Sequence, residues 1–111
     1  MGASFTVSIY GSMRCYAPML MSLQRLVETG DGPVIHAVDA ALERDEFEAQ
    51  GRDAQVVAIV LRPSWSEGFI NTKAKLLAMK YGGERRMIAL LGVPRKRLSP
   101  EVQAMAKWVL Y

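Results

Sequence analysis

Hydrophobic and polar positions follow two alternating periods along the chain, and each change of period predicts a new element. From Phe5 to Tyr10 apolar and polar residues alternate, which is typical of a strand, and Gly11 and Ser12 then break the run. From Pro18 to Thr29 apolar residues recur at helical spacing. The same reasoning predicts further strands over 34–39, 55–61 and 86–91, and further helices over 40–50, 72–81 and from Pro100 onward.

The run Gln55–Leu61 (QVVAIVL) is the most continuous apolar segment and predicts a strand buried on both faces. Such strands belong to parallel sheets that helices cover. Strands and helices alternate through all 111 residues, so we expect one α/β domain over 1–111. The predicted fold is a small open parallel sheet of four strands, flavodoxin-like, in the order 2-1-3-4, with helices on both faces.

Two of the predicted helices have a defined apolar side. In the helix over 72–81 we expect three residues to face inward and the lysines to face largely outward; the inward residues are Leu76, Leu77 and Met79. Gly82 and Gly83 end this helix. In the last helix, Ser99 caps a proline in the first turn, and the apolar side is Val102, Met105, Ala106 and Val109.

The predicted strand order places a ligand site between the first and third strands, because ligands bind where the order of an open α/β sheet reverses. The turn at 11–14 opens a helix whose free amide groups favour anions, and Arg14 adds a positive charge. Trp65, in the loop over 62–71, is a candidate for stacking on a base, and equally for covering the end of the core or contacting a partner surface. The predicted ligand-binding residues are Gly11, Ser12, Arg14, Asp39, Ser64, Trp65 and Gly68.

Two short segments of the chain, the turn after the first strand and the loop after the third, resemble those of a known family. Residues 10–14 (YGSMR), between a strand and a helix, look like the N-terminal signature of the nucleoside 2-deoxyribosyltransferase superfamily, which includes the 2′-deoxynucleoside 5′-phosphate N-hydrolases. Residues 63–69 (PSWSEGF) are similar to the family's third-strand loop. The resemblance implies a deoxyribosyltransferase-like fold, a nucleoside or nucleotide ligand, and a carboxylate nucleophile after the third strand.

The position of that nucleophile departs from the family's pattern. The family's glutamate would align with Ile70 or Lys75, and neither side chain can attack an anomeric carbon. Glu67 is the only carboxylate nearby and is therefore the candidate catalytic residue. The chain is thus expected to bind a nucleoside or nucleotide, either without catalysis or as a divergent N-glycosidase that uses Glu67. Whether it is an enzyme stays open.

A second class of function follows from the basic residues of the C-terminal third. These residues are Arg85, Arg86, Arg95, Lys96 and Arg97, and as a group they are a candidate surface for nucleic acid or a partner protein. The net charge of +3 is compatible with anionic ligands but does not require nucleic acid.

Composition narrows the remaining possibilities. No apolar run is long enough to span a membrane and no secretory signal is visible, and the single cysteine, Cys15, fits a reducing cytoplasm. His36 has no second ligand at metal-binding spacing, so we expect a core or edge histidine, no metal site and no cofactor. Seven methionines and the open sheet edges predict a homodimer.

Overall fold

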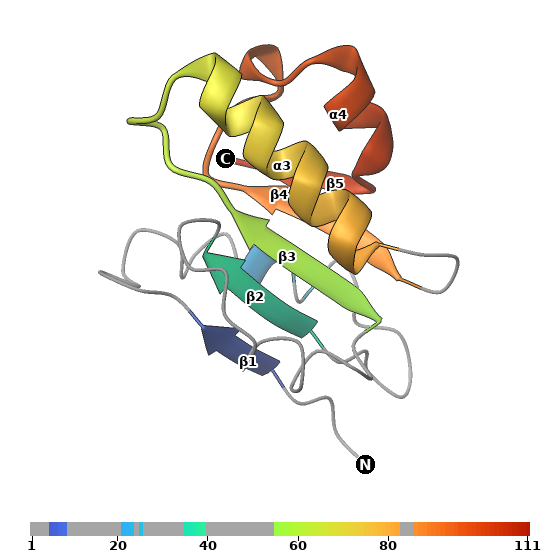
Figure 1. Ribbon diagram of the computed structural model, residues 1–111. Helices are drawn as coiled ribbons and strands as arrows, with labels where there is room; N and C mark the ends of the chain where they lie inside the picture. Colours follow the sequence, from blue (N-terminus) through green and yellow to red (C-terminus); the bar gives the residue numbers. More distant parts are fainter. Residues whose placement is uncertain (1–4, 9–20, 24, 26–34, 40–54, 83–85) are drawn as a thin grey trace.

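A computed structural model describes residues 5–8, 21–23, 25, 35–39, 55–82 and 86–111, and their strands form one parallel sheet (Figure 1). The strands are β1 (Phe5–Ser8), β2 (Ile35–Asp39), β3 (Val56–Val60), β4 (Met87–Leu91) and β5 (Trp108–Leu110). The helices that the structure describes from end to end are α3 (Glu67–Tyr81), the 3₁₀ helix η2 (Arg95–Arg97) and α4 (Pro100–Met105). The α/β class and the open parallel sheet are therefore confirmed.

The strand order is β1-β2-β3-β4-β5, which corrects the predicted order 2-1-3-4. β2 lies between β1 and β3, since His36 is in register with Thr6 on one side and with Val57 on the other. The pattern within each strand predicts which strands are buried. It does not specify on which side of β1 the next strand lies, because that depends on the direction of the connection between them.

The C-terminal residues form a fifth strand instead of extending the last helix. α4 ends at Met105, so Val109, predicted on the helix, lies in β5. The backbone N–H of Lys107 donates to the carbonyl of Ile88 at 2.8 Å, and that of Gly92 donates to the carbonyl of Leu110 at 3.0 Å. The sequence Trp-Val-Leu favours a strand, and pairing with β4 outweighs the helical spacing of the apolar residues.

Each face of the sheet contributes to its own core. Helices α3 and α4 cover one face, where β3 contributes Val57 and Ile59. On the other face, Val56 and Ala58 pack in a cluster with Leu23, one of the helical residues 21–23. β3 is buried along its whole length, as its apolar run predicted. Right-handed connections that step in one direction across a sheet share a face, which explains why α3 and α4 lie together.

His36 lies in β2 with only 6% of its surface exposed, which confirms a core histidine. Burial lowers the pKa of this imidazole below its ordinary 6.5, and the positive charge of Arg86 lowers it further. Within the described ranges, no three His, Cys, Asp or Glu residues are grouped so that they could hold a metal ion. No described helix combines the length and the apolar character that crossing a bilayer requires.

Candidate functional site

The loop after β3 is shorter than predicted, and this moves two candidate residues onto a helix. α3 begins at Glu67 instead of Thr72 because Ser66 caps it: the Ser66 Oγ accepts a hydrogen bond from the backbone N–H of Phe69 at 3.2 Å. Glu67 and Gly68 therefore belong to the first turn of α3. The loop that remains is Arg62–Ser66, directly beyond the carboxyl end of β3.

The side chain of Arg97 joins this loop to the segment after β4. Its Nη1 donates to the Pro63 carbonyl at 2.6 Å, and its Nη2 donates to the Trp65 carbonyl at 2.7 Å. Its Nε lies 3.9 Å from Oε1 of Glu67. Only 22% of the Arg97 side chain is exposed. The planar, five-donor guanidinium thus holds two loops that are more than thirty residues apart in sequence.

Asn71 makes a second connection between the same segments. Its Nδ2 donates to the carbonyl of Glu67 at 2.8 Å and to the carbonyl of Arg97 at 3.0 Å. Its Oδ1 accepts from the backbone N–H of Ser99 at 2.7 Å. Sequence reasoning missed this residue. At the predicted bounds it gave no signal, because Asn71 ended the loop over 62–71, where an asparagine is ordinary; only the earlier start of α3 places it inside a helix, where its side chain needs partners.

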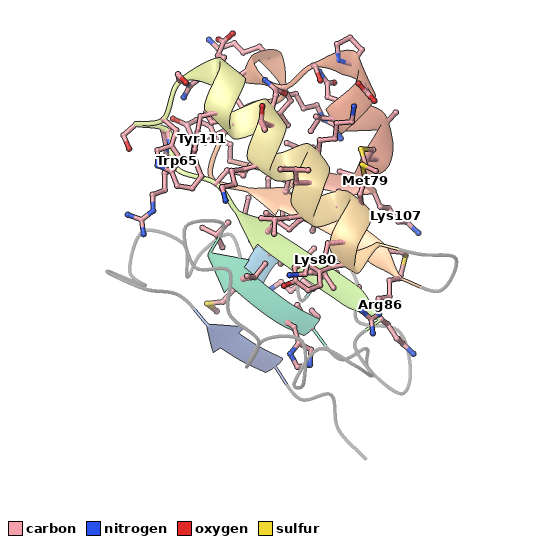
Figure 2. All side chains as sticks on the ribbon, in the orientation of Figure 1. Trp65, Met79, Lys80, Arg86, Lys107 and Tyr111 are labelled. Carbon is pink, nitrogen blue, oxygen red and sulfur yellow. The ribbon has the colours of Figure 1, made fainter. Side chains whose placement is uncertain are left out.

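Trp65 lies at this edge of the sheet, partly buried against the core beneath α3. Its ring and that of Phe69 meet edge to face, with centroids 4.9 Å apart and planes at 81°. Figure 2 shows Trp65 and Tyr111 toward the carboxyl ends of the strands and Arg86 toward the opposite edge. Gly92, with a φ of 100°, makes the turn that leads from β4 into the segment carrying η2.

The predicted basic group is divided between the amino and the carboxyl ends of the strands. Arg86 directly precedes β4, whereas Arg95, Lys96 and Arg97 follow its carboxyl end. Arg97 is used to hold the neighbouring loop, while Arg95 and Lys96 are exposed on η2. Arg85 lies outside the described residues.

The predicted crevice between the first and third strands depended on a reversal of strand order, and the sheet has β2 at that place. Of its lining, Gly11, Ser12 and Arg14 lie outside the described residues, as does Cys15. Asp39 is the last residue of β2 and so reaches the same carboxyl edge. The candidate residues that the structure does describe lie instead beyond the carboxyl ends of β3 and β4, farther along the sheet than the predicted crevice.

The remaining predicted residues are close together on this edge. Ser64 is exposed in the loop, and Gly68 is exposed on α3, where an added Cβ would meet no atom within 4 Å. The Glu67 side chain is 67% exposed, with the Arg97 guanidinium as its charged neighbour. We call the surface formed by Ser64, Trp65, Gly68, Arg95 and Lys96 the carboxyl-edge site.

Comparison with family models, with curated proteins and with solved structures gave no significant match. The resemblance to the nucleoside 2-deoxyribosyltransferase superfamily therefore stays a prediction, and the argument for function depends on the site itself.

Proposed function

We propose that this chain is a binding domain for a nucleotide, which it holds at the carboxyl-edge site without cleaving it. The observation that carries the proposal is the Arg97 side chain. Its two hydrogen bonds join the loop that contains Trp65 to the helix η2 that contains Arg95 and Lys96. An aromatic ring and two exposed cations are thereby held beyond the carboxyl ends of β3 and β4, the side of an open α/β sheet on which ligands lie. Because the strand order has no reversal, the proposal depends on these side chains and not on the topology.

The two cations supply recognition of a phosphate. Arg95 and Lys96 are exposed and adjacent, and among the described residues neither side chain forms an ion pair. A guanidinium can bind two phosphate oxygens at once, and such charge-assisted bonds are about twice as strong as neutral ones. A 5′-monophosphate is therefore expected to bind more tightly than the corresponding nucleoside.

Gly68 offers an independent way to detect the ligand. Because a Cβ there meets no atom of the protein, Gly68→Ala should leave the fold intact and stabilise α3 by up to about 1 kcal/mol. If the ligand lies against the first turn of α3, the added methyl group obstructs it. Weaker binding by a more stable protein would therefore locate the ligand without ambiguity from unfolding.

The test is a calorimetric and thermal-shift titration with 2′-deoxynucleosides and their 5′-monophosphates. We expect the monophosphates to bind about tenfold more tightly, which corresponds to ~1.4 kcal/mol. Arg95→Ala together with Lys96→Ala should remove this difference. Lys107→Ala is the matched control, because Lys107 is an exposed cation at the amino end of β5, away from the site. Equal binding of both ligand classes, or no binding, would refute the proposal.

A divergent N-glycosidase is the catalytic alternative, with Glu67 as nucleophile. It is distinguished by base release from the same ligands. Covalent catalysis predicts release that Glu67→Gln abolishes while binding survives. Our proposal predicts no release from the unmodified chain, so any release sensitive to this substitution would favour the alternative.

The nucleic-acid alternative and the homodimer are separate proposals with their own tests. Arg86 and Arg95 lie at opposite ends of β4, so a nucleic acid that uses the whole basic group contacts both, and loss of binding on neutralising either one would support this alternative. The homodimer is supported by the edges at β1 and β5 and by the exposed Met21. Light scattering that shows a monomer at high concentration would exclude it.

A further inference from the structure

The 3₁₀ helix η2 carries the two exposed cations of the carboxyl-edge site, and other elements hold it in place. It has only three residues, and 3₁₀ hydrogen bonds have poorer geometry than those of an α-helix, so η2 does not maintain its shape alone. Val93 before it and Leu98 after it are buried in the core beneath α3. The Arg97 and Asn71 side chains hold it to the loop after β3 and to the start of α3, beside which it lies in Figure 1.

Gln103, on α4, holds η2 from a third element. Its Nε2 donates to the carbonyl of Arg95 at 3.0 Å and to the carbonyl of Leu98 at 2.9 Å. A glutamine amide has two N–H donors, so these bonds use both of them. The Arg95 carbonyl also accepts from the backbone N–H of Leu98 at 2.9 Å, which occupies its second lone pair. All the donor capacity of the Gln103 side chain is thus directed to the segment that carries the cations.

These bonds keep the carbonyl groups of the segment away from an approaching anion. Asn71 donates to the Arg97 carbonyl at 3.0 Å, so three carbonyls of residues 95–98 accept hydrogen bonds from amide side chains. Carbonyl oxygens carry partial negative charge and repel anions. Because these three face N–H donors of the protein, and the side chains of Arg95 and Lys96 are exposed, the outer surface of η2 favours an anion.

We propose that Gln103 is a positioning residue for phosphate: it fixes the η2 backbone so that Arg95 and Lys96 form a preformed phosphate site. This role rests on the proposed function, since it acts through the same phosphate contacts. The group recognised is a phosphate dianion, on a nucleotide or free in solution. A phosphate that binds to a segment already held rigid causes a smaller loss of conformational entropy than one that must order the segment first. Gln103 itself does not touch the ligand.

The experiment follows the backbone amide signals of residues 95–98 by NMR in the isotopically labelled full chain. The chain is titrated with inorganic phosphate and, separately, with a 2′-deoxynucleoside 5′-monophosphate. Gln103→Met preserves the length of the side chain and removes both hydrogen bonds, so it should weaken both ligands about threefold to tenfold. Gln103→Glu should weaken them by at least about tenfold, because a carboxylate cannot donate to the carbonyls and competes with phosphate for Arg95.

Two controls separate positioning from a general loss of stability. Val102 is buried on the same helix and, being apolar, cannot donate a hydrogen bond to η2. Val102→Ala should therefore lower the melting temperature without changing the affinity for phosphate. The nucleoside, which lacks the phosphate, should bind to the Gln103→Met variant and to the unmodified chain equally. A residue that only stabilises the fold would instead affect all three ligands alike.

Failure of this role and failure of the proposed function give different results. Unchanged phosphate affinity in Gln103→Met, or an equal loss in Val102→Ala, would overturn the positioning role and leave the nucleotide proposal intact. A nucleotide that binds no more tightly than inorganic phosphate would refute the nucleotide proposal, whereas weaker phosphate binding by Gln103→Met would still support the role of Gln103. Absence of binding by either ligand to the unmodified chain would overturn both.

Discussion

The carboxyl-edge loops and the outer face of α3 use their side chains in opposite ways. At the edge, polar groups of Arg97 and Asn71 are directed inward and make five hydrogen bonds to the backbone, and they hold the loops together. On α3, the apolar side chains of Leu76 and Met79 point outward and contribute little to the fold. A charged residue can thus be structural, and an aliphatic one can lie exposed at the surface.

This difference determines which substitutions report on stability and which report on function. Changes to the inward polar groups should unfold the edge and affect binding only as a consequence. Changes to Arg95 and Lys96 should alter binding while the fold persists, and changes to Leu76 and Met79 should leave the fold intact. The predictions below test that division, from the largest expected effect to the smallest.

Asn71→Ala should cause the largest loss of stability, because it removes three hydrogen bonds at once and leaves the Ser99 N–H and two carbonyls without their partner. We expect the free energy of unfolding to fall by about 3 kcal/mol, since each of the three lost hydrogen bonds contributes about 1 kcal/mol net. Chemical denaturation measures this loss directly. Thr72→Ala, on the exposed side of the same helix, is the control, and an equal loss there would refute the structural role of Asn71.

Arg97→Ala should cost about 2 kcal/mol, because two charge-assisted bonds to the carbonyls of Pro63 and Trp65 are lost. Arg97→Lys should recover little of this, since an ammonium group does not reproduce the forked geometry of a guanidinium. Trp65 fluorescence should change in both variants as the loop is released. If Arg97→Ala instead weakens nucleotide binding at unchanged stability, Arg97 belongs with Arg95 and Lys96 as a ligand-binding residue.

Much of the fold could be predicted from the sequence because the central strands carry their own signals. The run at 55–61 identified the doubly buried strand, and Gly82 ends α3, where its N–H donates to the Ala78 carbonyl at 2.8 Å. The strand order and β5 could not be predicted in this way. Both depend on pairing between distant segments, and β5 forms because β4 offers an unpaired edge to three residues that also fit a helical pattern.

The site was predicted less completely, because the role of a side chain depends on which neighbours the fold brings to it. Ser64, Trp65 and Gly68 lie together beyond the carboxyl end of β3, as the predicted loop implied, and their role in ligand binding stays a prediction. Asn71 was missed because two of its three partners, at Arg97 and Ser99, are more than twenty-five residues away in the sequence.

The outward side of α3 was also predicted incorrectly. The prediction that Leu76 and Met79 face inward was wrong, since they are 54% and 64% exposed, whereas Leu77 is buried as expected. Two leucines in succession point to different sides of a helix, and only packing decides which one is buried.

A pH titration sharpens the comparison because it charges a residue buried in β2 instead of one on either surface. His36 is the chain's single histidine, and its folded-state pKa lies below the ordinary 6.5. The unfolded chain therefore binds the proton more readily, so stability is complete above 6.5 and decreases as the pH falls from there toward the lowered pKa. The melting temperature should decrease over this window, and His36→Gln should abolish that component. An unchanged profile in His36→Gln would contradict the assignment.

The smallest expected effect concerns the outer face of α3 and is the most direct test of the comparison. Leu76→Gln and Met79→Gln should each change the free energy of unfolding by less than about 0.5 kcal/mol, as is usual for exposed positions that make no specific contact. Leu77→Ala, one residue away but fully buried, should cost about 3 kcal/mol and serves as the reference. Denaturation of all three variants at low protein concentration measures the difference. A loss above about 1.5 kcal/mol at Leu76 or Met79 would mean that the chain's own residues cover this face, since only burial makes an aliphatic side chain contribute that much to folding. In that case the face is part of the core, and its apolar character needs no further explanation.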